Sequence, residues 1–213
     1  MKILKLKLFQ ETACYKKPFS FKVSETYPLP PYSTLIGMLH KIIGAKSGEY
    51  FPMNISIQGG YESIFSNYQT LRKYKKDEIT SMPMNVHQLL NINLIIHMQA
   101  EDYIVDKIYE NIINGKETFT LGRNEDLIRV DCIKIINETK LEEECIPDNS
   151  MYVPLNKQKD INGINYRLNT TYKIENEIRK WNKVNVKYIE KGTQELLYNV
   201  IKDEDGDIIM LYE

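Results

Sequence analysis

The residues best suited to bind a ligand lie on one face of a helix predicted near the N-terminus. Residues 33–44 (STLIGMLHKIIG) carry apolar side chains at the spacing of a helix with one buried face. Ser33 stands in the position of an N-cap after a turn built on prolines, and Gly44 supplies a C-terminal stop. The opposite face of this helix collects small, polar and basic residues: Ser33, Gly37, His40, Lys41 and Gly44.

Gly37 decides how this face is interpreted. Glycine inside a helix costs about 1 kcal/mol relative to alanine, so its presence requires a physical reason. One interpretation is that Gly37 lets the helix pack closely on a sheet, with His40 and Lys41 simply solvated. The other is that a polyanion backbone runs along this face, attracted by the helix N-terminus and by Lys41. Residue order alone leaves both interpretations open.

A second candidate site interrupts the run at residues 118–136 (TFTLGRNEDLIRVDCIKII), which is otherwise rich in strand-forming residues. Gly122, Arg123 and Asn124 form either a bulge or hairpin turn, or an opened turn whose amides and arginine hold a phosphate or a base. Glu125 and Asp126 are placed to orient Arg123 by a salt bridge.

Residues 66–86 form a third candidate, because basic side chains there surround Tyr68 and Tyr74 without a core-forming period. The segment predicts an exposed hairpin or flexible arm, either solvated or in contact with nucleic acid through stacking and phosphate binding. Lys5 and Lys7 alternate with leucines in a predicted N-terminal strand and are further candidate contacts. The basic cluster consists of Arg72, Lys73, Lys75 and Lys76.

Composition restricts the class of protein more than the function. The 213 residues predict one core with an appendage or a small second domain. Lys plus Arg number 28 and Asp plus Glu 29, so the whole-chain charge gives no argument for nucleic acid. The basic residues are unevenly spread, because residues 1–46 hold eight lysines against two glutamates.

The three cysteines, Cys14, Cys132 and Cys145, fit neither a disulfide framework nor a zinc site. His87 and His97 have no acidic neighbour in sequence, so we predict no metal and no cofactor. No apolar run approaches membrane-spanning length, and the N-terminus does not resemble a signal peptide. We therefore expect a cytoplasmic protein with no membrane partner.

The periodicities predict the element order strand, helix, strand, excursion, strand, helix, strand over residues 1–149. This β-α-β-β-α-β order is that of the α+β ferredoxin-like fold, whose RNA-binding variants read single strands. We expect residues 1–149 to form the RNA-binding domain, with a thumb insertion around 66–86. Residues 150–213 are expected to form a small β-rich extension that closes with a hairpin at Asp205–Gly206.

Two motifs in this order resemble a known family. Residues 28–44 (PLPPYSTLIGMLHKIIG) and 119–128 (FTLGRNEDLI) are similar to the CRISPR-associated Cas-five family of the RAMP superfamily, most closely its small type I-B members. The likeness covers most of residues 1–135. It implies a non-catalytic subunit of a type I Cascade surveillance complex that holds the crRNA 5′ handle in antiviral defence. The implied partners are the crRNA, the Cas-seven backbone subunit and the large Cascade subunit.

The resemblance also assigns roles to residues of this chain. It implies that the first helix contacts the handle, that residues 122–124 make a second contact, and that the cluster at 72–76 belongs to a thumb-like hairpin beside the guide. The residues implied at the first contact are Pro31, Tyr32, Ser33, Gly37 and Lys41, with His40 on the same helix face.

Two other functions remain open at this stage. One branch of the family, from type I-C systems, cuts the crRNA precursor without metal, using tyrosine, lysine and histidine. This chain offers Tyr32, His40 and Lys41 but no lysine–histidine pair that matches that branch, so we expect no catalytic residues. The second alternative is a ferredoxin-like small-molecule or regulatory module, which would lack a steep salt dependence of RNA binding.

Overall fold

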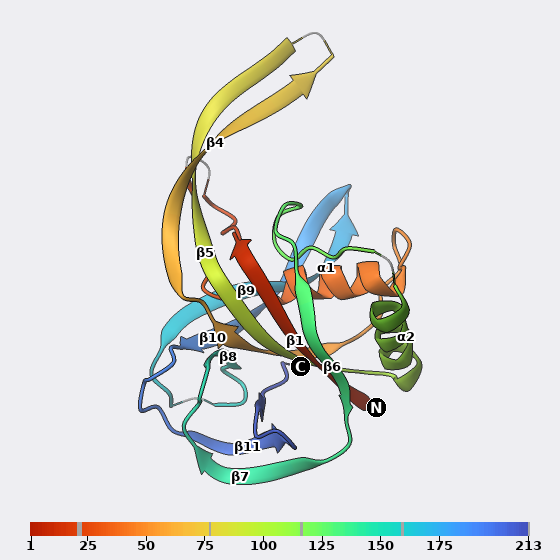
Figure 1. Cartoon of the computed structure of the whole chain (residues 1–213), viewed down its shortest axis with the longest axis vertical. Helices are drawn as coiled ribbons and strands as arrows, with labels where there is room; N and C mark the ends of the chain where they lie inside the picture. Colours follow the sequence, from red (N-terminus) through yellow and green to blue (C-terminus); the bar gives the residue numbers. More distant parts are fainter. Residues whose placement is uncertain (21–22, 77, 116, 159, 213) are drawn as a thin grey trace.

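Antiparallel strand pairing accounts for most of this fold, and two helices complete it (Figure 1). The computed structural model describes residues 1–20, 23–76, 78–115, 117–158 and 160–212. In chain order the elements are β1 (Lys2–Ala13), β2 (Val23–Ser24), α1 (Tyr32–Ile43), β3 (Asn54–Gly60), β4 (Ser63–Lys75), β5 (Glu78–Ala100), α2 (Asp102–Asn114), β6 (Arg129–Ile136), β7 (Thr139–Cys145), β8 (Ser150–Pro154), β9 (Ile164–Glu175), β10 (Ile178–Ile189), β11 (Leu197–Asp203) and β12 (Ile208–Ile209).

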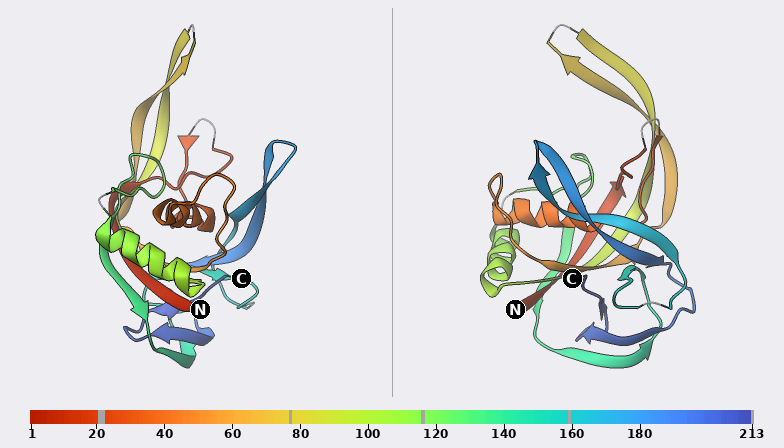
Figure 2. Two further views of the ribbon diagram at one scale, coloured as in Figure 1. Left: turned by 90° about the vertical axis from the view of Figure 1, so that its right-hand side faces the viewer. Right: turned by 180° about the vertical axis from the view of Figure 1, so that it is seen from behind.

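The main sheet has the strand order β6-β1-β5-β3-β8-β10-β9, and each strand on this path is antiparallel to its neighbours. The four strands predicted for the core, β1, β3, β5 and β6, are adjacent in it. The helices α1 and α2 lie on one face of this sheet (Figure 2). That face is apolar because alternate residues of β1 and β5 are leucine, isoleucine or methionine.

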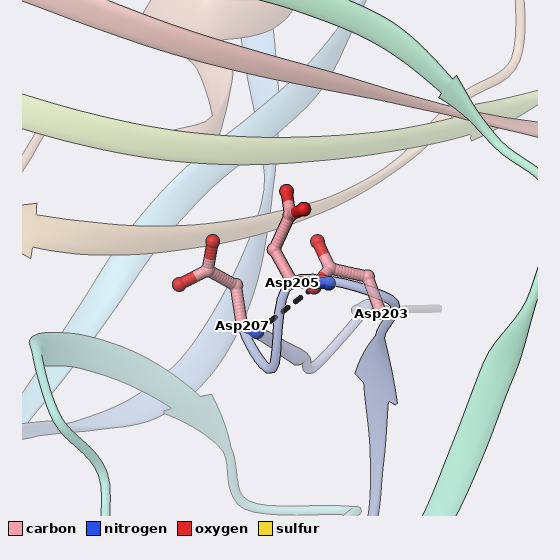
Figure 3. A group of neighbouring side chains, drawn as sticks. All are labelled: Asp203, Asp205 and Asp207. Carbon is pink, nitrogen blue, oxygen red and sulfur yellow. Dashed lines mark hydrogen bonds between the residues drawn. The ribbon is translucent and has the colours of Figure 1, made fainter.

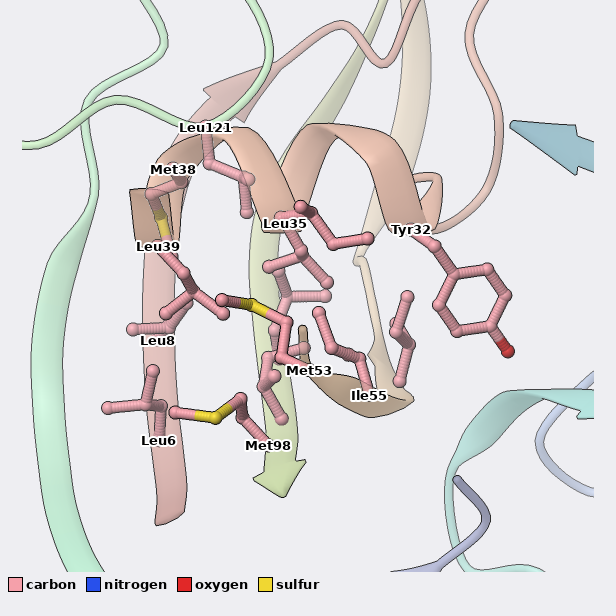
Figure 4. Close-up of a cluster of buried hydrophobic side chains, with 14 of the residues drawn as sticks. Leu6, Leu8, Tyr32, Leu35, Met38, Leu39, Met53, Ile55, Met98 and Leu121 are labelled. Atoms are coloured by element: carbon pink, nitrogen blue, oxygen red, sulfur yellow. The ribbon is translucent and has the colours of Figure 1, made fainter. Parts of the chain in front are cut away.

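The principal core fills the space between the sheet and α1 (Figure 4). Each fully buried aliphatic side chain there contributes on the order of 1.5–3 kcal/mol of hydrophobic stabilisation. The alternation of Leu4, Leu6 and Leu8 predicted for the first strand is confirmed, since all three side chains are buried. Side chains from four elements meet in this core: Leu6 and Leu8, Leu35 and Leu39, Ile55, and Met98.

The N-cap of helix α1 lies two residues earlier than predicted. The N-cap is Pro31, with extended backbone, so Ser33 lies inside the first turn and the N-cap prediction for Ser33 is wrong. Gly44 ends the helix as predicted, because its left-handed backbone (φ 76°) allows its N–H to bond to carbonyl oxygens of the last turn. Helix α2 buries Ile104, Val105 and Ile108.

A long hairpin of β4 and β5, here called the thumb hairpin (residues 63–90), continues two central strands of the main sheet. Asn54 lies opposite Gln99 where β3 begins, and Lys75 lies opposite Glu78 at the far end of β4. Each step forward along β3 or β4 matches one step back along β5, and no residue is gained or lost between the two ladders. β3 and β4 therefore follow β5 in a single register. The hairpin is therefore an extension of the sheet and not a loop attached to it.

The last third of the chain completes the main sheet and also covers its second face. Gln58 of β3 pairs with Met151 of β8, so strand pairing crosses the predicted domain boundary at residue 149. A three-stranded sheet, β12-β11-β7, packs against the face opposite the helices over a second core. The predicted closing hairpin at Asp205–Gly206 is confirmed as the β11–β12 turn. Apolar residues of this second core include Met151, Val153, Ile189, Leu197 and Ile208.

Two further observations concern the cysteines and the helices. The three cysteines are free thiols, and Cys14 and Cys145 are buried. Within the described ranges, neither helix has the length and apolar character needed to cross a membrane.

Candidate nucleic-acid interface

The outer face of α1 is open to solvent at its glycine. Gly37 is exposed, and a Cβ atom added there would meet nothing within 4 Å. Gly37 therefore does not serve close packing within the described part of the chain, so the packing half of the first interpretation is ruled out. Lys41 is exposed on the same face, and Ser33 is half-buried beside it. This face can accept a backbone from outside the molecule.

His40 belongs to the same helix but is held by the chain's own backbone. Its Nδ1 lies 2.8 Å from the carbonyl oxygen of Ile36, and its Nε2 accepts a hydrogen bond of 3.0 Å from the N–H of Phe51. The imidazole also stacks on Tyr50, with the ring centroids 5.5 Å apart. Both ring nitrogens are thus engaged, Nδ1 within α1 and Nε2 with the loop after it, so His40 offers RNA no free nitrogen in this conformation.

Tyr32 and Pro31 are buried, which corrects their assignment as RNA contacts. The Tyr32 side chain has no exposed surface and packs on Tyr152 and on Tyr212, whose ring centroid is 4.4 Å away. Tyr32 lies three positions before Leu35 and so belongs to the buried stripe of the helix. Burial raises the pKa of the Tyr32 phenol far above its ordinary value.

The bend at residues 122–124 is built around the buried carboxylate of Asp126. This carboxylate accepts hydrogen bonds from the backbone N–H groups of Cys14 (3.0 Å) and Arg123 (2.8 Å). The guanidinium of Arg123 donates to Asp126 (2.7 Å), lies 3.0 Å from Glu125 and reaches Gln69 of the thumb hairpin at 3.1 Å. The predicted salt bridges are confirmed, and they leave the charge of Arg123 already balanced by two carboxylates.

Gly122 is required by this geometry. Its φ of +112° lies in the region that side chains rarely adopt, and an added Cβ would come 2.8 Å from a carboxylate oxygen of Asp126. Gly122 and Asn124 are both exposed, so they remain available as contacts, whereas Arg123 is half-buried and acts mainly as a link to the thumb hairpin.

The basic cluster of the thumb hairpin divides between two faces. Side chains alternate along β4, so Lys73 and Lys75 share one face with Gln69, while Arg72 shares the other with Tyr68 and Tyr74. Gln69 contacts Arg123, so the face that carries Lys73 and Lys75, here called the lysine face, turns towards the bend. Lys76 is exposed in the turn after β4.

Lys5 is sealed beneath the C-terminal sheet, which corrects its assignment as an RNA contact. Its Nζ lies 2.5–2.6 Å from carboxylates of Asp203, Asp205 and Asp207, and the side chain has no exposed surface. Figure 3 shows these three carboxylates projecting from the β11–β12 turn. They lie close enough together to hold a cation, and the ammonium of Lys5 supplies that charge.

The pKa values in this cluster follow from its charge balance. Burial alone would lower the pKa of Lys5, but hydrogen bonds from its ammonium to the three carboxylates raise it. Burial would raise the pKa of Asp203, but hydrogen bonds from His97 and Lys5 hold it far below its usual range. Lys7 is less enclosed, with its Nζ 3.4 Å from Asp207 and its side chain 40 % exposed.

Lys173 and Lys180 lie on the exposed β9–β10 hairpin and are not among the candidate contacts predicted from the sequence. One sequence signal would have predicted this hairpin. Apolar and polar residues alternate on both sides of Asn176, and asparagine tolerates the positive φ that a tight turn needs.

The fold and these surfaces define a β-rich protein with an exposed helix face beside a projecting basic hairpin. A family model described as CRISPR-associated protein (Cas_Cas5) matches residues 3–178. The chain belongs to this family, as its sequence motifs indicated. No curated protein matches the sequence.

Solved structures share the fold at low sequence identity. A chain from a "CRISPR RNA-guided surveillance complex" aligns with a TM-score of 0.62 and 12 % identity, covering 90 % of each chain. A structure described as "Crystal structure of Cas protein" aligns with a TM-score of 0.52 and 11 % identity, covering 88 % of this chain and 93 % of the other. A CRISPR protein from Archaeoglobus fulgidus aligns with a TM-score of 0.50 and 11 % identity, covering 98 % of this chain and 97 % of the other.

Proposed function

We propose that this chain is a subunit of a CRISPR effector complex that binds the 5′ handle of the crRNA as a non-catalytic scaffold. The observation that carries the proposal is the open face at Gly37 of α1. The bend and the thumb hairpin, whose lysine face turns towards the bend, project on the same side of the molecule as α1 (Figures 1 and 2). A strand of RNA following this path would meet exposed cations at Lys41, Lys73 and Lys75. Membership of the CRISPR-associated family supports the assignment to such a complex.

The strand order supports a ferredoxin-like core. α1 connects β1 to β3 and α2 connects β5 to β6, while the four strands lie in the order β6-β1-β5-β3 with antiparallel pairing. These are the features expected of the β-α-β-β-α-β unit. We assign the chain to the small type I-B members on the two motifs at 28–44 and 119–128.

The environments of His40 and Tyr32 support a role without catalysis. General base catalysis needs a group that can accept a proton near the operating pH and reach the substrate. His40 has both nitrogens bonded to backbone groups, and the Tyr32 phenol is buried with a strongly raised pKa. In the described conformation, neither side chain can take the part that tyrosine and histidine play in the nuclease branch of the family.

The proposed protein partners are the Cas-seven backbone subunit and the large subunit of the complex. Exposed apolar side chains on the thumb hairpin support a protein contact there, because single-chain proteins seldom expose so many together. Those more than half exposed are Ile64, Tyr68, Tyr74 and Ile79.

Binding and cleavage are separated by one experiment on the purified full-length chain. The protein is titrated against a labelled repeat RNA that includes the 5′ handle, in EDTA and at several salt concentrations. We expect binding that weakens steeply with salt and no cleavage product. A discrete product that His40→Ala abolishes would instead indicate the endoribonuclease, and the absence of salt-sensitive binding would contradict RNA binding altogether.

A further inference from the structure

A second hairpin, formed by β9 and β10, projects on the other side of α1 from the thumb hairpin (Figures 1 and 2). Strands β9 and β10 extend from the edge of the main sheet, and their outer half carries exposed residues. This hairpin is basic, since residues 164–189 hold six cations against two carboxylates. They are Arg167, Lys173, Arg179, Lys180, Lys183 and Lys187 against Glu175 and Glu177.

Strand alternation determines which cations face α1. Val184 of β10 packs against the principal core, on the side of the sheet that the helices cover. The β9–β10 ladder shifts register between Trp181 and Lys183, where β9 has one extra residue. Because the bulge is in β9, the alternation along β10 is kept, so Lys180, four positions before Val184, lies on the same face of β10. Lys173 is the direct cross-strand partner of Lys180. Lys173 and Lys180 therefore lie on the α1 side of this hairpin, and both are exposed.

The opposite face of the hairpin carries its own stabilising contacts. The rings of Tyr172 and Trp181 meet edge to face, with centroids 5.1 Å apart, and the guanidinium of Arg179 lies 4.6 Å from the centroid of Tyr172. An aromatic pair of this kind contributes about 0.5–1.5 kcal/mol beyond area burial. The hairpin is thus held together from its far side and does not need the lysine pair for stability.

The lysine pair itself opposes the fold. Like charges directly opposite each other on neighbouring strands are destabilising. Glu175 offsets one of them, with its carboxylate 3.1 Å from the Nζ of Lys180. Lys173 has no ion-pair partner anywhere in the part of the chain that the structure describes. An anion bound between the two ammonium groups would relieve this repulsion.

We propose that Lys173 and Lys180 form a second phosphate-contact site for single-stranded RNA, facing the lysine face of the thumb hairpin across α1. The proposal rests on the proposed function, because the same RNA strand is held from both sides of the helix. Phosphates contact Lys73 and Lys75 on one side and Lys173 and Lys180 on the other, with the open face of Gly37 between them.

The test compares two double variants of the full-length chain that lose the same charge from the same hairpin. Lys173→Gln/Lys180→Gln removes the cations on the α1 side, and the matched control Arg167→Gln/Lys183→Gln removes two exposed cations from the opposite face while leaving the Arg179–Tyr172 contact intact. Affinity for a short labelled oligouridylate is measured by fluorescence anisotropy at several salt concentrations. The emission of Trp181, the single tryptophan, verifies that the hairpin is intact in each variant.

We expect Lys173→Gln/Lys180→Gln to weaken binding about tenfold or more and to reduce the salt slope by about 1.4, because two phosphate contacts are lost at about 0.7 each. Its thermal midpoint should not fall, since a repulsive pair is removed. The control should bind within about threefold of the parent chain. An equal loss of affinity in both double variants, or no loss in either, would overturn the second site while leaving RNA binding by the parent chain intact. A parent chain that binds no oligouridylate would contradict the proposed function as well.

Discussion

At the scale of single residues, Gly37 connects sequence and function most directly. Its position inside a helix is unfavourable, and nothing in the described chain occupies the space that a side chain would take. The sequence made Gly37 conspicuous, but only the structure excludes close packing as its cause.

Gly37→Ala should make the isolated protein more stable and weaken its binding to RNA. Alanine gains about 0.5–1 kcal/mol of helix stability, because glycine loses more backbone entropy on folding. The new methyl group meets nothing in the chain, so urea unfolding should show a higher free energy of unfolding. A variant that is less stable than the parent chain would show that Gly37 serves internal packing after all.

Lys5→Met should destabilise the protein strongly. Removal of the ammonium leaves Asp203, Asp205 and Asp207 without their common cation, and breaking a buried ion pair costs about 3–5 kcal/mol. Lys7→Met is the matched control on the same strand, and we expect it to cost less than about 1 kcal/mol, because that side chain is partly solvated. Similar unfolding free energies for the two variants would contradict the sealed position of Lys5.

Protonation of Asp203 should lower the free energy of unfolding in acid. Because hydrogen bonds depress its pKa in the folded state, its contribution is complete above the ordinary value of 3.8 and is lost as the pH falls below that value. Asp203→Asn should therefore be less stable at neutral pH and show a flatter decline below about pH 4. The introduced amide would keep an oxygen for the turn N–H groups of Asp205 and Asp207, so the turn itself should survive. Parallel acid profiles for parent and variant would exclude Asp203 as the source.

The two wrong assignments at this scale have different origins. Local periodicity made Lys5 look solvated, because its carboxylate partners lie about two hundred residues further along the chain. The family resemblance implied an RNA contact at Tyr32, even though its spacing from Leu35 places Tyr32 on the buried stripe, so the sequence contained that signal. The pairing of Arg123 with Asp126 was predictable because the two residues are close in sequence.

At the scale of elements, the thumb hairpin shows what periodicity can and cannot reveal. Its outer residues lack a core-forming pattern because both faces are exposed, so the sequence predicted an arm without its direction. The continuous register with β5 sets that direction, and the contact between Gln69 and Arg123 orients its faces. The β9–β10 hairpin escaped prediction for the same reason.

Two neighbouring residues of the thumb hairpin should differ in their effect on RNA. Lys73→Gln removes a cation from the lysine face, whereas Arg72→Gln removes one from the tyrosine-bearing face. We expect Lys73→Gln to weaken RNA binding several-fold more and to reduce the salt slope by about 0.7, the value for one phosphate on a single strand. Anisotropy titrations over a range of salt measure both quantities. A larger loss for Arg72→Gln would place the RNA on the opposite face of the hairpin.

At the scale of the whole molecule, the C-terminal sheet restricts the surface that is open to the proposed RNA strand. In RNA-recognition folds built on this kind of sheet, bases often stack on the face opposite the helices. Here that face is covered by the three-stranded sheet and carries buried groups such as Lys5, Ser56 and His97. The open path therefore runs over α1, between two basic hairpins that project from the same end of the molecule (Figure 2). The sequence predicted a β-rich extension. It could not predict the face on which that extension packs, because the contacts that fix it join residues far apart in the chain.

The most direct test of this account is photo-crosslinking of the full-length chain to a single-stranded RNA that contains 4-thiouridine, with the crosslinked peptides identified by mass spectrometry. The account predicts crosslinks in residues 33–44 of α1 and on the lysine face at 73–75. Crosslinks confined to the C-terminal sheet of β7, β11 and β12 would contradict it.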